Sequence, residues 1–526
     1  MSSNSAPAQT WKPKAGPYVT AFAVMLAPFM EVLDTSVANV ALPHMSGSFS
    51  ATSEEILWVI TSYLIANGII IPTTAWFSGF FGRKRFLSLC IIIFTLSSAL
   101  CGAANSLGLM VIARIIQGAG GGALVPISQS ILLESFPPEK RGVGMAIFGL
   151  GIIVAPIIGP VLGGFITDHY SWRWIFYINI PVGILAIVLI NLLIEDPPYI
   201  KKGNVNRIDY IGFSALIVWL VTLQIILDKG QQADWFASNW VCWMSALSFC
   251  SMVFFIIWEL TYEDRIINLK VFGDLNFTMG SILSMFVGAV LYGTLAMLPL
   301  FLQTLMGYSA LKSGLTVAPR GMGAFTAMVL AGILSDKIPL KIQIGSGFLL
   351  LFISNYMLAN INFQIAPQNI IFPNILSGIG ISFIFIPLTT AAFMTLKNEQ
   401  IGNATGLFNL MRNIGGGIGT SLVSTMLSRN AQKHQAYMVD HLNSCSAVFQ
   451  EKLNIMSNYL SMNMDSVTAS LKANKMMYLN LLRQTNLFSF VDNFKMFGII
   501  SLFVIPSVLV FKELKSVSGK SKMMMH

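Results

Sequence analysis

Long apolar runs separated by short polar turns dominate the chain from about residue 18 onward. A helix needs about 18 or more consecutive apolar residues to cross the hydrocarbon core of a bilayer, and these runs reach that length. We count fourteen runs, at about 18–41, 56–78, 87–104, 107–132, 142–166, 174–194, 208–227, 240–260, 276–302, 314–334, 342–361, 369–395, 403–427 and 494–512. The pattern therefore predicts an all-α membrane protein with fourteen transmembrane helices.

The polar segments between the runs differ in charge. The chain carries 32 Lys and Arg and has a net charge of +9. If the N-terminus lies inside, nineteen of these cations fall on cytoplasmic segments, and the short outer loops hold only Arg173, Lys229 and Lys312. Basic residues are enriched on the cytoplasmic side of membrane proteins. The net charge thus indicates topology rather than nucleic-acid binding, and it predicts cytoplasmic N- and C-termini.

Two acids interrupt the first apolar run, Glu31 and Asp34. A charged group inside a bilayer is costly, so it normally faces a partner or an aqueous path used by an ion or a substrate. The two positions are neighbours on one face of a helix, and two carboxylates in a poorly solvated site do not both ionise cheaply. We therefore expect one of them to bind a proton, with Asp34 as the principal site and Glu31 in a secondary role.

Arg114 lies well inside the fourth apolar run, with Gln117 one turn further on. No acid lies near Arg114 in its own run, so Asp34 or Glu31 is its expected partner across a helix interface. Alternatively, Arg114 simply clamps two helices together.

The fifth run combines small residues with prolines. Ala155, Gly159 and Gly163 recur at every fourth position, which permits a neighbouring helix to approach closely. Pro156 and Pro160 remove backbone hydrogen bonds and permit bending. Together with Gly151, these residues indicate a helix at which two halves of the protein rock against each other, although ordinary membrane packing also explains the pattern.

Two short loop motifs indicate an internal duplication. Gly82 and Arg83 follow the second run, and Gly332 and Asp336 follow the tenth. Ala75 and Gly332 are 257 positions apart, and the same offset carries Pro160 into the glycine run at 415–419. We therefore expect two pseudo-symmetric six-helix bundles. The predicted domains are residues 1–200, an inserted pair of spans at 201–270, and residues 271–526, which include a long outer loop at 428–492.

Three motifs together resemble one transporter family. They are LDTSVANVALP at residues 33–43, RIIQGAG at 114–120 and GPVLGG at 159–164. They are similar to the motifs of the 14-spanner drug:proton antiporters, the EmrB/QacA group of the major facilitator superfamily. The resemblance implies a major facilitator fold and export of lipophilic drugs by alternating access, driven by the proton gradient without a cofactor.

The resemblance also implies a bacterial inner-membrane location, surrounded by membrane lipids. It implies two protein partners, a periplasmic adaptor (an EmrA-type membrane fusion protein) and an outer-membrane channel. The 428–492 segment is the candidate docking surface for the adaptor; alternatively, it forms amphipathic helices that lie on the membrane or cap the outer mouth. The candidate polar contacts to substrate are Asn39, Asn67, Gln117, Asn409 and Arg412, and a packing role is an equal alternative for Arg412.

Other chemistry finds no support in the sequence. There is no GxxxxGK[S/T] phosphate-binding loop and no nucleophile-elbow motif, and the five histidines lack metal-ligand spacing. An enzyme, an ATP-driven pump and a metal site are therefore not expected. Two alternatives remain: an exporter of one defined solute, such as a siderophore, lipid or amino acid, and a membrane sensor that transports nothing.

Overall fold

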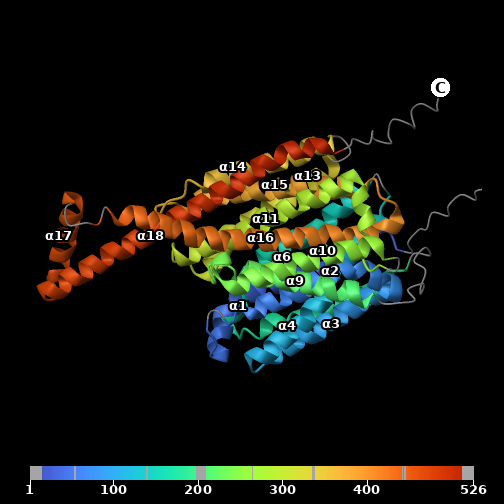
Figure 1. Ribbon diagram of the computed structural model, residues 1–526, viewed down its shortest axis with the longest axis horizontal. Coiled ribbons are helices and arrows are strands. Elements are labelled where there is room, and N and C mark those ends of the chain that lie inside the picture. The colour runs from blue at the N-terminus through green and yellow to red at the C-terminus, as the bar shows by residue number, and fades with distance from the viewer. Residues whose placement is uncertain are drawn as a thin grey trace, which may run out of the picture.

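The computed structural model describes residues 15–52, 55–137, 140–196, 209–262, 265–334, 338–440, 442 and 446–511. Every regular element in this part of the chain is a helix. Most helices run along the long axis of the molecule as one bundle (Figure 1). We call the end of the bundle that carries the turn between α2 and α3 the Arg83 end, and the opposite end the α17 end.

Most of the first group of helices lies in the lower part of the bundle in Figure 1, coloured from blue to green. It consists of α1 (Pro17–Phe49), α2 (Trp58–Phe81), α3 (Arg83–Ala103), α4 (Leu107–Gly121), α5 (Leu124–Ser135), α6 (Arg141–His169), α7 (Trp174–Tyr177) and α8 (Asn179–Leu193). Helices α4 and α5 form one span, as do α7 and α8. This group therefore supplies six spans, as the sequence predicts.

The second group forms the upper part, coloured yellow to red. It consists of α11 (Leu275–Thr304), α12 (Ala310–Val317), α13 (Pro319–Leu334), α14 (Leu340–Leu358), α15 (Pro367–Phe393), α16 (Asn398–Val439), α17 (Ala447–Ser461) and α18 (Ser466–Val504). Its core is formed by the close packing of α11 on α16 and of α15 on α13 and α14.

Two inserted helices, α9 (Tyr210–Lys229) and α10 (Asn239–Thr261), lie between these groups. They pack on each other, and α9 also contacts α2 of the first group and α16 of the second. The inserted pair therefore covers one seam between the groups, in front of it in Figure 1. The other seam, where α6 packs on α13 and α12, lies on different helices.

Twelve helical segments of the described chain are long and apolar enough to cross a membrane. The two further predicted spans correspond to α12–α13, which is broken at Pro319, and to α16, whose ends are polar. Both are packed within the bundle, α13 against α15 and α6 and α16 against α11. The fold is consistent with fourteen spans, and the protein is a multi-pass membrane protein.

The duplication is visible in the helix starts. Helices α3 and α14 begin 257 positions apart, at Arg83 and Leu340, and so do α6 and α16, at Arg141 and Asn398. The guanidinium of Arg141 donates a hydrogen bond of 3.0 Å to the side-chain oxygen of Asn398. Equivalent positions in the two groups therefore touch at the Arg83 end, as expected close to a pseudo-two-fold axis.

The segment at 428–492 is helical over most of its described length. Helix α16 continues to Val439 and α18 starts at Ser466, so both extend well beyond the runs that we expected at 403–427 and 494–512. These extensions carry α17 away from the bundle (Figure 1). The spacing of Phe449, Leu453, Met456 and Leu460 in the sequence predicts one apolar face of a helix. In the structure these four residues are half-buried in α17, which packs on α18.

Candidate functional site

The two acids of α1 lie inside the first group of helices. Glu31 is 8% exposed and Asp34 is 2% exposed. Burying a charge is costly unless hydrogen bonds and an opposite charge compensate it. The partners of each acid therefore indicate which of the two is stabilised as a carboxylate.

Asp34 is fully compensated. The guanidinium Nη1 of Arg114 donates to Asp34 Oδ2 at 2.6 Å, in an ion pair whose side chains are 0% and 1% exposed. The other carboxylate oxygen, Oδ1, accepts from the amides of Gln117 at 3.0 Å and Asn179 at 2.7 Å. Three helices, α1, α4 and α8, thus meet around one carboxylate.

Arg114 is held at the same time by the first group's own backbone and rings. Its Nε donates to the carbonyl oxygen of Val59 at 2.9 Å, and its guanidinium lies 4.2 Å from the ring centre of Tyr63. A cation over an aromatic face gains electrostatic energy when both are desolvated. The predicted pairing of Arg114 with an acid is therefore present, and the acid is Asp34.

Glu31 has a different environment. One of its oxygens, Oε1, accepts from the amide of Asn67 at 2.7 Å, while Oε2 is buried without a hydrogen-bond partner in the described part of the chain. The buried hydroxyl of Tyr63 and the guanidinium of Arg412 interact electrostatically with it. The two acids therefore share a helix but not their partners.

The second group contributes polar contacts at the same depth. Asn409 on α16 donates to the side-chain oxygen of Gln129 on α5 at 2.6 Å, and Arg412 donates to the side-chain oxygen of Asn409, also at 2.6 Å. The chain Gln129–Asn409–Arg412 therefore crosses from one group to the other. Arg412 also lies within electrostatic range of Glu31, although no direct ion pair joins the two side chains.

Of the expected substrate contacts, Asn67, Gln117, Asn409 and Arg412 belong to these buried networks. Asn39 does not, because it is exposed and its amide donates only to the backbone oxygen of Thr35, one turn earlier.

The sequence reasoning missed three buried polar residues: Asn179 and Gln129, which belong to these networks, and Arg320, which lies outside them. Asn179 and Gln129 are polar side chains inside apolar runs, and that signal could have identified them. Arg320 is a buried cation of α13 whose guanidinium donates to the hydroxyl of Thr294 at 3.1 Å.

Helix α6 packs on α1 through the predicted small-residue stripe. A Cβ atom on Gly159 would lie 2.3 Å from Ser36 Oγ, and one on Gly163 would lie 3.0 Å from Val37. The hydroxyl of Ser36 donates to the carbonyl oxygen of Pro156 at 3.3 Å. That oxygen lacks its usual helical donor because Pro160, four residues later, has no N–H.

The remaining motif residues of α6 also lie at interfaces. A Cβ atom on Gly151 would lie 2.5 Å from Met25 of α1. Pro160 faces the other group, since a Cβ atom on Gly314 of α12 would lie 3.3 Å from it. Helix α6 thus touches α1 on one side and the second group on the other.

The loop motif after α2 is built around a glycine with a positive φ and a buried cation. Gly82 has a φ of 83°, a left-handed conformation that favours glycine. Arg83 is buried and forms an ion pair with Glu134 at the end of α5. In the second copy Gly332 lies within α13, and Asp336 lies outside the described residues.

Comparison with known proteins agrees with this architecture. The family profile described as Major Facilitator Superfamily matches residues 24–420. The chain belongs to the major facilitator superfamily. Two solved structures share the fold. The human organic anion transporter MFSD10 (TETRAN) has a TM-score of 0.60 and 13% identity, and the match covers 94% of this chain and 100% of that one. The proton:xylose symporter XylE has a TM-score of 0.57 and 17% identity, and the match covers 88% of this chain and 96% of that one.

Relatives of higher identity are export and resistance proteins. The chain is 36% identical to the fatty acid resistance protein FarB of Neisseria gonorrhoeae over 81% of its own length and 84% of that protein. It is 34% identical to the multidrug export protein EmrB of Haemophilus influenzae over 83% and 86% of the two chains, and 34% identical to EmrB of Escherichia coli (strain K12) over 81% and 83%. This major facilitator protein is thus an EmrB-like transporter and not an enzyme.

Proposed function

We propose that this major facilitator protein exports lipophilic small molecules from the cytoplasm in exchange for protons, by alternating access. The observation that carries the proposal is the pair of unequal acids on α1. Asp34 is satisfied by a cation and two amides, whereas Glu31 keeps a buried oxygen without a partner and interacts with a cation of the other group. The multidrug export proteins among the relatives support lipophilic substrates.

The two acids take different roles in this mechanism. Asp34 holds Arg114, Gln117 and Asn179 together, so it serves as the fixed centre of the first group. Glu31 is the group that can take up a proton without breaking an ion pair within its own group. This assignment places the transported proton on Glu31 rather than on Asp34, where the sequence alone led us to expect it.

Proton binding at Glu31 then weakens the attraction between the two groups. A carboxylate at Glu31 attracts Arg412, and a neutral carboxyl does not. A proton entering from the outside would thus loosen this contact, and its release to the cytoplasm would restore it, while the substrate moves outward. Helix α6, with its proline-freed carbonyl and its stripe of small residues, supplies a surface on which the groups can move.

The test compares two neutral substitutions on α1 in everted membrane vesicles. Glu31→Gln should abolish uptake driven by a proton gradient, while binding of a lipophilic dye and thermal stability stay close to wild type. Asp34→Asn should lose both transport and stability, because it leaves Arg114 buried without a carboxylate. Gradient-driven transport by Glu31→Gln at the wild-type rate would refute the proton assignment.

We further propose that the Arg83 end faces the cytoplasm of a bacterial inner membrane. The basis is the positive-inside bias of the loops. Single cysteines introduced at Lys270 and Ser457 in a cysteine-free protein test this orientation. An impermeant thiol reagent should label Ser457→Cys from outside and Lys270→Cys only after the membrane is opened. The reverse pattern would overturn the orientation.

The projection formed by α17 and the ends of α16 and α18 is the proposed contact for a periplasmic adaptor, through which an outer-membrane channel would be reached. None of the residues of α17 is fully buried, and the helix lies away from the bundle (Figure 1). Deleting α17 should leave transport in vesicles intact but abolish export across the whole cell envelope. If the shortened protein still crosslinks to the adaptor as wild type does, another surface makes the contact.

A narrower substrate class, lipophilic anions, is a second candidate. Arg320 and Arg412 are buried cations of the second group, and neither has a carboxylate from its own group as a partner in the described chain. Resistance to fatty acids, named for the relative FarB, fits such a site. Competition between a long-chain fatty acid and a lipophilic cation for export distinguishes an anion exporter from an exporter of lipophilic compounds in general. In an anion exporter, Arg320→Met should lower export of the fatty acid and leave export of the cation unchanged.

A further inference from the structure

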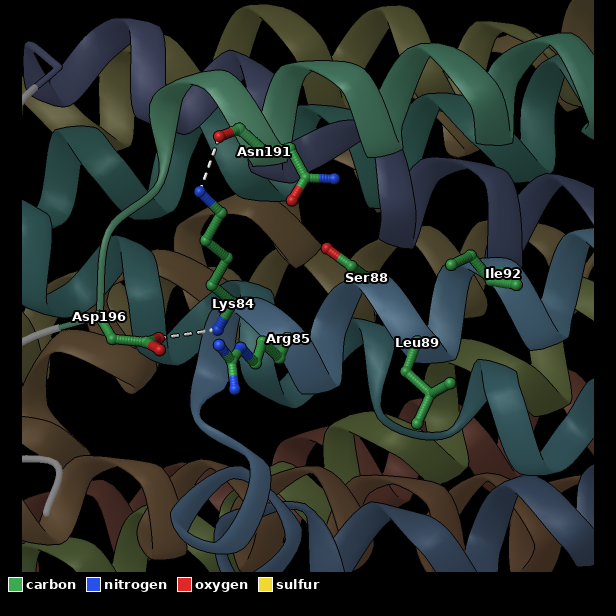
Figure 2. A pocket seen from close by; sticks show the side chains of 7 residues that line it. All are labelled: Lys84, Arg85, Ser88, Leu89, Ile92, Asn191 and Asp196. Atoms are coloured by element: carbon green, nitrogen blue, oxygen red, sulfur yellow. Dashed lines mark hydrogen bonds between the residues drawn. The ribbon is translucent and has the colours of Figure 1, made fainter. Parts of the chain in front are cut away.

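A groove of about 570 Å³ opens between the start of α3 and the end of α8, at the Arg83 end of the bundle. Figure 2 shows the side chains that line it: Lys84, Arg85, Ser88, Asn191 and Asp196 around its polar part, with Leu89 and Ile92 further along α3. None of these residues takes part in the networks of Glu31 and Asp34. The groove is therefore separate from the proposed transport site.

The polar part of the groove carries a net charge of +1. Lys84 Nζ donates to the carbonyl oxygen of Asn191 at 2.7 Å, and the backbone N–H of Lys84 donates to Asp196 Oδ1 at 2.8 Å. Arg85 is exposed and has no acidic partner among the described residues. Two cations and one carboxylate thus leave one positive charge, which complements one phosphodiester.

A buried donor without a partner points into the same space. Ser88 is 9% exposed, and its hydroxyl has no hydrogen-bond partner in the described chain. The hydroxyl is directed toward the gap between Lys84 and Asn191 (Figure 2). A buried polar group is normally satisfied, so an unsatisfied one that lines a groove indicates a ligand atom at that position.

The groove also changes from polar to apolar along α3. Lys84 and Arg85 lie in the first turn, while Leu89 and Ile92, each 40% exposed, follow one and two turns later toward the middle of the span. A phospholipid has the same order of groups, with a charged phosphate at the membrane surface and acyl chains below it.

We propose that this groove binds the phosphodiester headgroup of an anionic glycerophospholipid from the leaflet at the Arg83 end. Arg85 and Lys84 supply the positive charge, Ser88 Oγ donates to a phosphate oxygen, and Leu89 and Ile92 contact the first acyl segments. The lipid would hold α3 and α8 together on the outer face of the first group.

Native mass spectrometry of the full chain in detergent tests this site, with phosphatidylglycerol and phosphatidylcholine of identical acyl chains as probes. The wild type should retain phosphatidylglycerol in preference to phosphatidylcholine. Arg85→Gln should weaken phosphatidylglycerol binding about fivefold, because one basic residue at an anionic surface contributes ~1 kcal/mol to the binding free energy. Ser88→Ala should weaken it about two- to tenfold, the range expected for one hydrogen bond.

Lys270→Gln is the matched control, because it removes an exposed cation at the same end of the bundle, away from the groove. Its lipid binding should equal that of the wild type. Equal binding by wild type and Arg85→Gln would overturn the proposal, as would an equal loss in Lys270→Gln. Displacement of the lipid by millimolar glycerol phosphate would show that the site takes a soluble phosphate instead. Because Arg85 is exposed, its variant tests the site even if Ser88→Ala lowers stability.

Discussion

The two halves of the bundle share a backbone plan but carry opposite charges at their centres. The offset of 257 residues seen at the helix starts maps Glu31 onto Gly288 and Asp34 onto Leu291, so α11 lacks both acids of α1. In the opposite direction it maps Arg412 onto Ala155, so α6 lacks the cation of α16. The duplication thus preserved the packing of helices while the polar groups diverged.

The presence of Gly288 in α11, where α1 has Glu31, affects how the helices pack. A Cβ atom on Gly288 would lie 2.1 Å from the carbonyl oxygen of Arg412, so the backbones of α11 and α16 approach where α1 has a large acid. The second half gains a close helix contact and a base, and the first half keeps an acid. An acid in one half facing a base in the other provides electrostatic contact between the halves, which identical halves could not provide.

The largest effect is expected from neutralising Asp34, one of the two acids that have no counterpart in the second half. Asp34→Asn leaves Arg114 buried with no opposite charge, so the free energy of unfolding should fall by about 3–5 kcal/mol. Thermal unfolding in detergent measures this loss. Asn39→Ala, on the same helix but outside the network, should leave the unfolding temperature unchanged. An unchanged unfolding temperature in Asp34→Asn would show that the Arg114 contact contributes little to stability.

The next effect concerns the glycine that replaces an acid in the second half. Gly288→Ala places a methyl group against a backbone oxygen that cannot rotate away, and overpacking of this kind costs about 1–3 kcal/mol. Gly345→Ala on α14 is the control, because no atom lies within 4 Å of its Cβ position. If chemical denaturation finds both variants equally stable, the α11–α16 contact at Gly288 has room for a methyl group.

A similar substitution probes the corresponding contact of the first half. Gly159→Ala brings a methyl group close to both Oγ and Cβ of Ser36, so turning the hydroxyl alone does not relieve the clash. We expect a loss of about 1 kcal/mol, at the low end of the overpacking range, together with slower transport. Gly164→Ala, whose nearest neighbour would be 3.9 Å away, should behave as wild type in both measurements.

The smallest effect is expected for a charge outside the membrane. Asp465 accepts the backbone N–H of Thr468 at the start of α18, and these hydrogen bonds lower the pKa of its carboxyl below the ordinary value. The stabilisation is therefore present at neutral pH and is lost as the pH falls below about 4. Hydrogen exchange of the first turn of α18 should become faster on acidification in wild type. Asp465→Asn should show little change with pH, and an equal pH response in both would exclude Asp465 as the cause.

Much of the architecture could be predicted because each part depends on local sequence. Apolar runs of about twenty residues predict spans, and every predicted run corresponds to a helix or a helix pair of the bundle. The face of α17 with Phe449 and Leu453 also followed from periodicity alone. The lengths of α16 and α18 did not follow, because polar residues continue a helix beyond the membrane without any apolar signal.

The sequence by itself determined the membrane class, the family motifs, the duplication and the presence of charges at membrane depth. Only the tertiary structure decided how these charges are paired. Asp34 meets Asn179 across 145 positions of chain, whereas Asn39, five residues from Asp34, meets only its own helix. The physical reason is that side-chain contacts inside a bundle depend on how each helix is rotated and how the helices cross. Rotation and crossing are set by the packing of small residues between helices, and the sequence of one apolar run does not determine them. The same packing brings Glu31 of the first half within electrostatic range of Arg412 of the other half.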